Sequence, residues 1–417
     1  MSDSCNSRHF SWLVKSCFPT NQQHDPHQPQ PLPHHSTATA TADRHRRSTP
    51  ISSLPDDILL ECLSRVPPSS LPSVSLVCRR WSRLLHSPSF TLLRRRLGLL
   101  RLTLFAVAVS DYGLLTASHC FEDESWQLTF FPTPDEAVLT HARAVAIGRR
   151  IYILGRNVMI RYDAWTGTMS EKSPTVFPRK KFAAAVIAGK IYVAGGAART
   201  AAVEEYDPDT DEWRVVADAP RRRYGCIGAA VDGVFYVIGG LKIGASGNEP
   251  PRAAGVEAHV YASSMDLYDV EAGGWLRSRA VPGGGCVVAA CAAGGHIFVL
   301  ASHAVELSFW RFDGRRKGGG SGGGGGFGEW CRIRSPPLPA QVRVDGSVRF
   351  GCVGVGEKVV LVQVTGSIDD LLRRSGRSVR GMKGGLVLVY DCIAGEWSRG
   401  ADLPEVLRRA ACVCVEC

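Results

Sequence analysis

The sequence predicts a multidomain protein in which a small all-α segment precedes a long all-β region. Residues 51–90 carry apolar side chains at helical spacing, whereas the region from about residue 100 repeats short strands separated by tight turns. The composition agrees, because 44 glycines in 417 residues with little helical patterning are typical of turn-rich β structure. We therefore expect two folded parts of different class.

The first 50 residues show no pattern that could form a core. The segment QQHDPHQPQPLPHHSTATATADRHRR is rich in Gln, His, Pro, Ser and Thr, a composition that cannot bury enough apolar surface to fold. Residues 1–50 are therefore expected to be a disordered low-complexity tail. The spacing of the histidines in this segment fixes no coordination geometry, so no metal site is expected there.

The helical segment opens with signals for the start of a helix. Ser53 can cap a helix, with Pro55 in its first turn and Asp56 and Asp57 near the positive end of the helix dipole. Apolar residues then recur at helical spacing until Pro67 stops the pattern. A first helix is expected between these signals.

A second helix is expected to begin after Pro72. Its apolar residues fall on one side as far as Leu85, and Pro88 ends it. A segment of about 40 residues cannot bury this much apolar surface by itself. The surplus indicates that the segment binds a partner.

The pieces LPDDILLECLSRVP, SVSLVCRRW and SPSF, in this order, resemble the F-box. The resemblance implies that residues 51–97 are an F-box domain that docks on a Skp-family adaptor and, through it, on a cullin–RING ubiquitin ligase. The expected adaptor interface and its supporting core comprise Leu54, Pro55, Ile58, Leu59, Leu63, Val66, Pro67, Leu71, Val74, Val77, Cys78 and Trp81.

The long region repeats itself. The two clearest units are FAAAVIAGKIYVAGG with VEEYDPDTDEW, and CIGAAVDGVFYVIGG with MDLYDVEAGGW, and their Gly-Gly pairs are 44 residues apart. This period fits four short strands per unit. Weaker copies begin at residues 141, 287 and 350. The segments 102–131 and 408–416 together supply a sixth unit, which closes a ring and leaves no open sheet edge.

These repeats resemble the kelch family of β-propellers, which implies a six-bladed propeller over residues 98–417, closed by the C-terminal strand. The glycine pairs are expected to allow tight backbone packing, and the aromatic residues to pack between neighbouring sheets. The residues that carry this structural pattern are Gly195, Gly196, Tyr206, Trp213, Gly239, Gly240, Tyr268, Trp275, Tyr390 and Trp397.

Charge and hydropathy narrow the class of partner. The net charge of +10 is concentrated at the start, because residues 1–100 carry 12 Lys or Arg and 6 Asp or Glu, against 37 and 33 in residues 101–417. No extended nucleic-acid face is therefore expected.

No signal peptide or membrane-spanning run is evident, and the 14 cysteines form no secreted-type framework. A cytoplasmic or nuclear location is expected, or both.

Two basic loops are the candidate contacts for a target protein. They are FPRKK and APRRRY, which occupy equivalent places in successive repeats, and they contribute Arg179, Lys180, Arg221, Arg222, Arg223 and Tyr224. Kelch units often carry an arginine at this point, so one arginine of each loop is also a candidate for a structural role. The surplus charge favours an acidic target surface.

The combined resemblance is to the F-box/kelch-repeat family, which is most frequent in plants. It implies a non-catalytic substrate-recognition subunit of an SCF-type E3 ubiquitin ligase, with an unknown protein target and with no cofactor or metal. The strand histidines lie in different repeats without a shared motif, and the tract GGGSGGGGG lacks the Lys-Ser/Thr of a phosphate loop. The alternatives are an adaptor-bound scaffold that recruits a partner without degradation, and a propeller that binds a small ligand.

Overall fold

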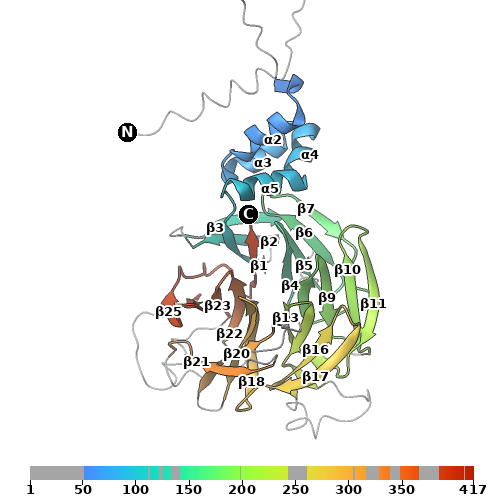
Figure 1. Cartoon of the computed structure of the whole chain (residues 1–417), viewed down its shortest axis with the longest axis vertical. Helices are drawn as coiled ribbons and strands as arrows, with labels where there is room; N and C mark the ends of the chain where they lie inside the picture. The colour runs from blue at the N-terminus through green and yellow to red at the C-terminus, as the bar shows by residue number, and fades with distance from the viewer. Residues whose placement is uncertain are drawn as a thin grey trace, which may run out of the picture. The chain divides into compact units, whose positions relative to one another are not determined.

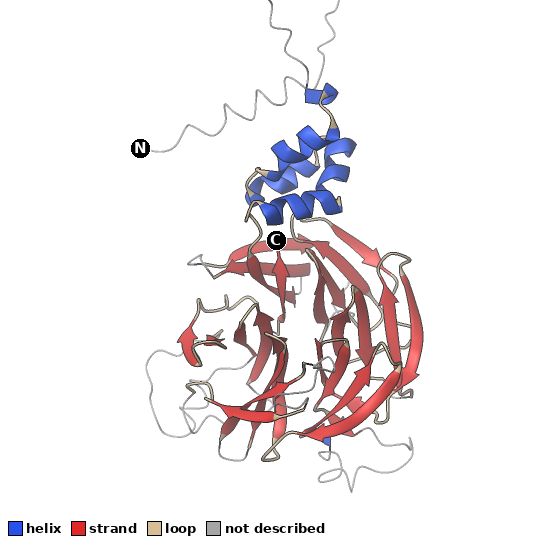
Figure 2. Ribbon diagram, viewed as in Figure 1, coloured by secondary structure: helices blue, strands red, loops and turns tan. Residues whose placement is uncertain are grey.

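The computed structural model describes residues 51–110, 113–121, 125–132, 141–197, 199–242, 261–303, 306–315, 328–338, 348–365, 385–407 and 409–417. The tail expected over residues 1–50 and the glycine tract at 318–326 lie outside the described residues. The chain divides into two compact units, one ending at Leu99 and the other beginning at Leu100. The first unit is helical and the second is built of strands (Figures 1 and 2).

The helical unit consists of short elements. Those described are η1 (Ile51–Ser53), α2 (Asp56–Ser64), η2 (Pro68–Ser70), α3 (Leu71–Ser75), α4 (Arg79–Leu85) and α5 (Pro88–Arg96). Pro55, not Ser53, is the N-cap residue of α2, and it makes no side-chain cap hydrogen bond. Asp56 and Asp57 lie in the first turn as expected, where their charges favour the helix dipole.

The predicted second helix is two helices, which corrects the sequence-based expectation. Pro72 lies inside the first turn of α3, where a missing N–H is tolerated, and not before the helix. The chain then becomes extended at Cys78, whose Sγ accepts a hydrogen bond from the backbone N–H of Trp81 at 3.5 Å and so starts α4. Pro88 is the first residue of α5, and Ser87 caps this helix by accepting from Phe90 N at 3.2 Å.

The second unit is a six-bladed β-propeller, as predicted, and its described residues form six four-stranded sheets (Figure 1). Blade 1 contains β26 (Ala411–Glu416), β1 (Leu102–Ser110), β2 (Gly113–Cys120) and β3 (Gln127–Pro132). Blade 2 contains β4 (Arg143–Ile147), β5 (Arg150–Leu154), β6 (Met159–Asp163) and β7 (Met169–Lys172). Blade 3 contains β8 (Ala183–Ile187), β9 (Lys190–Ala194), β10 (Ala202–Asp207) and β11 (Glu212–Asp218).

The remaining blades follow the same order. Blade 4 contains β13 (Ile227–Val231), β14 (Val234–Ile238), β16 (Ser264–Asp269) and β17 (Gly274–Ala280). Blade 5 contains β18 (Cys286–Ala293), β19 (His296–Ser302), β20 (Leu307–Asp313) and β21 (Trp330–Ile333). Blade 6 contains β22 (Arg349–Val355), β23 (Lys358–Thr365), β24 (Val387–Asp391) and β25 (Glu396–Arg399). A short ladder joins β12 (Arg223–Tyr224) to β15 (Leu241–Lys242).

The C-terminal strand closes the ring. β26 pairs antiparallel with β1 from Leu102 opposite Glu416 to Val107 opposite Ala411. Blade 1 therefore combines the first strands of the propeller with its last, and this pairing covers the edge that β1 would otherwise expose.

The aromatic pattern of the repeats sets the register of the outer strands. Tyr206 lies opposite Trp213, Tyr268 opposite Trp275, and Tyr390 opposite Trp397, and the ring centroids in these pairs are 5.1, 5.2 and 5.1 Å apart. Each indole Nε1 also donates to a backbone carbonyl of the preceding blade or connection, at Ser173, Asp218 and Arg334 respectively. The tryptophans therefore hold successive blades together.

Tight turns and close backbone contacts require particular residues. The hairpin turn of blade 3 has positive φ at Ala188 and Gly189, and that of blade 4 at Asp232 and Gly233, the conformation of the two-residue turn that matches strand twist. At Gly195, where φ is 73°, an added Cβ would lie 2.8 Å from the carbonyl oxygen of Arg223 in the next blade. Only glycine fits that contact without a shift of the backbone.

Candidate protein-interaction surfaces

The helical unit buries one group of apolar side chains in its interior. Its members are each at most 8% exposed, and they are Leu59, Leu63, Leu71, Val74, Trp81, Leu84, Leu85 and Phe90. Five of them, Leu59, Leu63, Leu71, Val74 and Trp81, belong to the predicted adaptor set. These five support the helices and are not accessible to a partner.

A buried arginine fixes the end of the first helix against the last. The side chain of Arg94 on α5 is fully buried, and its Nη1 donates to the carbonyl oxygens of Ser64 at 3.0 Å and Val66 at 2.8 Å. These carbonyls lie at the C-terminal end of α2, where a cation is favoured by the helix dipole. The contact orients α2, and with it the side chains that α2 exposes.

A second group of apolar side chains is exposed, and we call Pro55, Ile58, Leu76 and Val77 the apolar patch. Ile58 is 47% exposed, Leu76 81% and Val77 37%, and Pro55 is also exposed. Leu76 was not in the predicted set. Of the other predicted contacts, Pro67 and Cys78 are exposed, whereas Leu54 and Val66 are half-buried.

An ion pair joins the two segments of the apolar patch. Arg80 at the start of α4 donates from Nε to Asp56 Oδ1 at 2.8 Å and from Nη2 to the carbonyl oxygen of Leu54 at 2.5 Å. These contacts hold the start of α2 beside the residues that precede α4. The exposed apolar side chains of both segments are therefore neighbours on one surface.

In the propeller, two of the predicted target contacts are buried, which corrects that part of the expectation. Arg179 donates to Glu204 Oε1 from Nε at 2.8 Å and from Nη2 at 2.5 Å, and Arg223 donates from Nε to Asp266 Oδ2 at 2.8 Å. Both guanidinium groups are fully buried. They are held inside the blades because a carboxylate on the third strand neutralises each of them.

The buried arginines also bind the glycine pairs. Arg179 Nη1 donates to the carbonyl oxygen of Gly195 at 2.7 Å, and Arg223 Nη1 donates to that of Gly239 at 2.8 Å. Each arginine thus connects the loop before the inner strand to the end of the second strand of the same blade. Their role is structural, and neither can contact a partner in this arrangement.

The other four predicted target contacts retain some exposure. Lys180 is exposed, and Arg222 and Tyr224 are half-buried. The Arg221 side chain is 32% exposed and donates to Asp266 Oδ1 at 2.8 Å, so its charge is already paired.

A wider set of basic residues lies where the inner strands begin, and we call His141, Lys180, Lys181, Arg349 and Arg409 the cationic mouth. These residues precede or start β4, β8, β22 and β26. Lys180, Arg349 and Arg409 are exposed, and His141 and Lys181 are half-buried. Burial, followed by the charges of Lys181, Lys180, Arg349 and Arg409, lowers the pKa of His141. The four cations therefore act together on one point of the channel entrance.

Three members of the cationic mouth have a backbone conformation that favours glycine. His141, Lys181 and Arg409 have φ of 64°, 55° and 61°, and each lies two residues before its inner strand. Gly225 occupies the same position in blade 4, with φ of 76°. A side chain in this region costs about 1 kcal/mol, and such strain is concentrated at functional positions. Basic residues thus stand where the fold alone would favour glycine.

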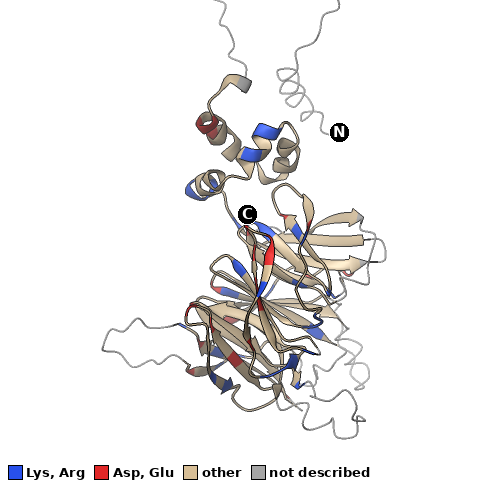
Figure 3. Cartoon of the chain, turned by 90° about the vertical axis from the view of Figure 1, so that its right-hand side faces the viewer, with Lys and Arg blue, Asp and Glu red and all other residues tan. Residues whose placement is uncertain are grey.

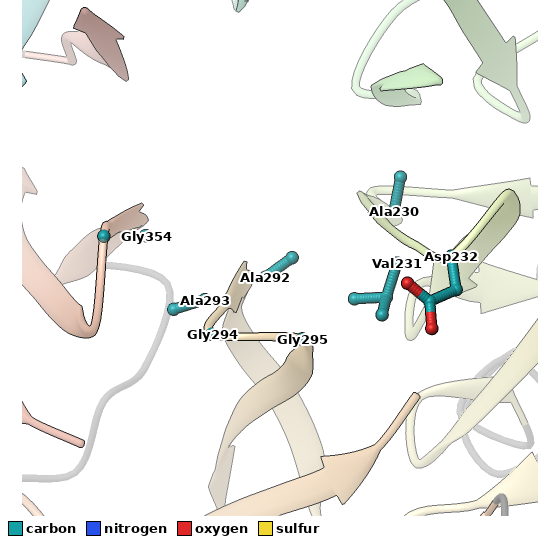
Figure 4. Close-up of a pocket in the computed structure, with 9 residues that line it drawn as sticks. Ala230, Val231, Asp232, Ala292, Ala293, Gly294, Gly295 and Gly354 are labelled. Carbon is teal, nitrogen blue, oxygen red and sulfur yellow. The ribbon is translucent and has the colours of Figure 1, made fainter. Parts of the chain in front are cut away.

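The opposite ends of the inner strands surround a cavity of about 360 Å³ (Figure 4). Its lining residues come from the first turns of blades 4, 5 and 6 and are mainly small, and Asp232 is the only charged one among them. In the described part of the chain, no group of three or more His, Cys, Asp and Glu residues is placed to hold a metal ion. The two ends of the channel therefore differ in charge, because the cations of the mouth lie at one end and Asp232 lies at the other.

Over the rest of the propeller, basic and acidic residues are interspersed in the view of Figure 3. Several exposed cations pair with carboxylates, as Arg332 does with Glu306 at 3.2 Å. None of the helices among the described residues is long and apolar enough to cross a membrane.

Comparison with known proteins agrees with both units. The family model of the F-box domain matches residues 51–93, and that of the kelch motif matches residues 178–220. The F-box/kelch-repeat protein At5g26960 of Arabidopsis thaliana is 60% identical over 432 aligned positions that cover 100% of each chain. The chain belongs to the F-box/kelch-repeat family. This confirms the family that the sequence motifs indicate.

More distant members of the F-box/kelch-repeat family match in part. F-box/kelch-repeat protein At1g67480 of Arabidopsis thaliana is 26% identical over 244 residues, which cover 55% of this chain and 61% of the relative. A solved structure, titled "Structure of YjhT", matches 65% of this chain and 85% of its own at 16% identity, with a TM-score of 0.45.

The F-box match ends within α5, and the kelch match covers the buried Arg179 and its partner Glu204. One sequence signal accompanies the two buried arginines, which lie four residues before their inner strands. Glu204 and Asp266 each lie two residues before the repeat tyrosine, whereas Ile160 and Leu388 hold this position in blades 2 and 6. Leu76 carried no such signal, because it fell inside a helix that the spacing had predicted to be continuous.

Proposed function

We propose that this chain is the substrate-recognition subunit of an SCF-type E3 ubiquitin ligase, acting in the cytoplasm or the nucleus. Its helical unit docks on a Skp-family adaptor through the apolar patch, and its propeller binds the protein to be ubiquitinated. The chain supplies no bond chemistry of its own. It raises the effective concentration of target lysines near the ubiquitin thioester, which accelerates transfer by proximity.

The observation that carries this proposal is the exposure of the apolar patch on a unit whose interior is already filled. Leu76 at 81% and Ile58 at 47% exposure are not among the buried residues of the interior, to which Leu59 and Trp81 belong. Exposed apolar side chains held in fixed positions are typical of helix-in-groove recognition. The Arg80–Asp56 pair supports this reading, because it fixes the spacing of the two exposed segments.

Titration of the purified chain with a Skp-family adaptor tests this docking. The double variant Ile58→Ala/Leu76→Ala is expected to lose about 2–4 kcal/mol of binding free energy, as for buried anchors of an interface. Leu92→Ala is the matched control, because Leu92 on α5 is 60% exposed and lies outside the apolar patch. Equal affinity of the double variant and the wild type would reject the patch as the adaptor site.

For the target, we infer a segment rich in Asp and Glu that binds at the cationic mouth. Three observations support this class of ligand: five basic residues at one channel entrance, the pKa of His141, which burial and then the four neighbouring cations lower, and the left-handed backbone of three of the five. Carboxylates would neutralise charges that the mouth holds close together, so binding should weaken as salt rises.

The triple variant Lys181→Glu/Arg349→Glu/Arg409→Glu tests the mouth. It is expected to retain the adaptor and to lose proteins captured in the presence of a proteasome inhibitor. The charge-matched control is Arg277→Glu/Arg334→Glu/Lys358→Glu, at exposed positions outside the cationic mouth. If the mouth variant captures the same proteins as the wild type, recognition occurs elsewhere on the propeller.

A further inference from the structure

The propeller channel contains cysteines that adaptor docking and target binding do not use. A second cavity, of about 250 Å³, is lined by the six inner strands β26, β4, β8, β13, β18 and β22. Its lining is made of Ala, Val and Gly together with four cysteines, which are Cys291, Cys352, Cys412 and Cys414. All four are free thiols.

Two of these thiols are in contact across a blade boundary. Cys291 lies on β18 of blade 5 and Cys352 on β22 of blade 6, and their Sγ atoms are 3.1 Å apart. Both belong to the apolar core between these two blades. The contact therefore joins two inner strands that are not hydrogen-bonded in one sheet.

The backbones approach closely enough at this point for a covalent link. A Cβ added to Gly354, two residues after Cys352, would lie 1.8 Å from the carbonyl oxygen of Ala292, the residue after Cys291. Disulfides require a short separation of the two backbones, and cysteines on distant strands cannot meet without distortion. Gly354 removes the side chain that would keep β18 and β22 apart.

The other two channel thiols lack this arrangement. Cys412 and Cys414 are alternate residues of β26, so they project to the same side about 7 Å apart along the strand. Both pack against the core between blades 6 and 1, away from the core that contains Cys291. Cys392, which packs against the same core as Cys291, is the remaining competitor for a pairing there.

We propose that Cys291 and Cys352 form a reversible disulfide under hydrogen peroxide, which joins blades 5 and 6 at the channel. Cys352 is half-buried and lines the cavity, so a small oxidant reaches it first. Burial, with the hydrogen bond and the charge of Cys352, raises the pKa of Cys291. Cys291 is buried beside Cys352, so its place is in the second step, the attack on the oxidised Cys352 sulfur.

The two steps of disulfide formation conserve atoms, protons and electrons. The Cys352 thiolate attacks one oxygen of hydrogen peroxide, the O–O bond breaks, and the released hydroxide takes a proton to become water, which leaves a sulfenic acid. The Cys291 sulfur then attacks that sulfenic sulfur, the S–O bond breaks, and the hydroxide leaves as water with the Cys291 proton. Two thiols lose two electrons, and one peroxide becomes two waters.

The disulfide would stabilise the ring where neighbouring blades meet. It would connect residues 61 apart in sequence and so restrict the unfolded chain. It would also fix the separation of β18 and β22 on the channel wall. This inference is independent of the adaptor and target surfaces, because neither Cys291 nor Cys352 belongs to them.

The full-length protein, reduced and then freed of reductant, is treated with graded hydrogen peroxide, alkylated and digested with trypsin. Mass spectrometry is expected to find residues 280–311 linked to residues 350–358, in a Cys286→Ser background because Cys286 shares the first peptide. The oxidised protein should melt roughly 5–10 °C higher than the reduced protein, and dithiothreitol should reverse both changes.

Cys291→Ser and Cys352→Ala are each expected to abolish the link and the shift in melting temperature, whereas Cys414→Ser should leave both intact. Two single variants are used so that a folding defect in one does not decide the result. If Cys291 and Cys352 remain alkylatable while exposed Cys331 is oxidised, the proposal is wrong. A link from Cys291 to Cys392 in their place would also overturn it.

Discussion

In blades 3 and 4 the arginine four residues before the inner strand is buried, whereas basic residues nearer the start of the inner strand in blades 1, 3 and 6 keep some exposure. The buried arginines depend on one acidic residue on the third strand. Glu204 and Asp266 neutralise Arg179 and Arg223 inside their blades, and apolar residues hold the equivalent position in blades 2 and 6. A basic loop therefore identifies a binding surface only through those charges that the fold has not already paired.

Deleting residues 411–417 should have the largest effect, because blade 1 is the only described blade built from both ends of the propeller. The deletion removes β26 and exposes the edge of β1 between Leu102 and Val107. Cooperative thermal unfolding of the propeller should be lost or shifted strongly downward, as measured by calorimetry. Unfolding at the full-length temperature would show that closure contributes little, and blade 1 would then not belong in the comparison.

Removing a buried arginine should have the next largest effect. Arg223→Ala leaves the buried Asp266 carboxylate paired only with the partly exposed Arg221, and should lower the free energy of unfolding by up to about 3–5 kcal/mol. The double variant Arg223→Met/Asp266→Leu should recover much of this loss, since it buries no charge. Lys180→Ala, at an exposed position, should change stability by less than about 0.5 kcal/mol. Denaturant titrations that find the same small loss for Arg223 and Lys180 would contradict the distinction between buried and exposed basic residues of these loops.

In contrast to Arg223→Ala, substitutions at the residues with left-handed backbone are not expected to lower stability. Lys181→Gly and Arg409→Gly relieve a strained φ, so stability should stay constant or rise by up to about 1 kcal/mol. Both variants should nevertheless capture less target, because each removes a charge from the mouth. A loss of stability on either substitution would instead show that the side chain has a structural role, as Arg179 has.

The smallest effect is a pH dependence of stability. The folded-state pKa of His141 is lowered below its ordinary value of 6.5 by burial and by the four nearby cations. The unfolded chain therefore binds the proton more tightly, so the contribution to stability is present above about pH 6.5 and is lost as pH falls through the folded pKa. His141→Gln should flatten the decline in unfolding free energy between pH 7 and pH 5. His296, whose pKa is also lowered, should keep its own part of the decline.

The repeats predicted the propeller because strand alternation, paired glycines and the Tyr–Trp spacing are local signals that all require the same geometry. The burial of Arg179 and Arg223 depends on acids 25 and 43 residues further along the chain, so it could not be read from the loops themselves. The helix break at Cys78 was also missed, because its cap is a thiol, which is not among the usual capping side chains. The exposure of Leu76 follows from that break.

The adaptor and the target are expected to bind two separate surfaces, and quantitative affinity purification under proteasome inhibition measures both at once. Wild type, Ile58→Ala/Leu76→Ala, and Lys181→Glu/Arg349→Glu/Arg409→Glu are compared by mass spectrometry of the captured proteins. The patch variant should lose the adaptor and the cullin but retain the targets, and the mouth variant should retain the adaptor and lose the targets. If either variant loses both classes of partner while it remains folded, or if neither loses any, the two surfaces do not act as described.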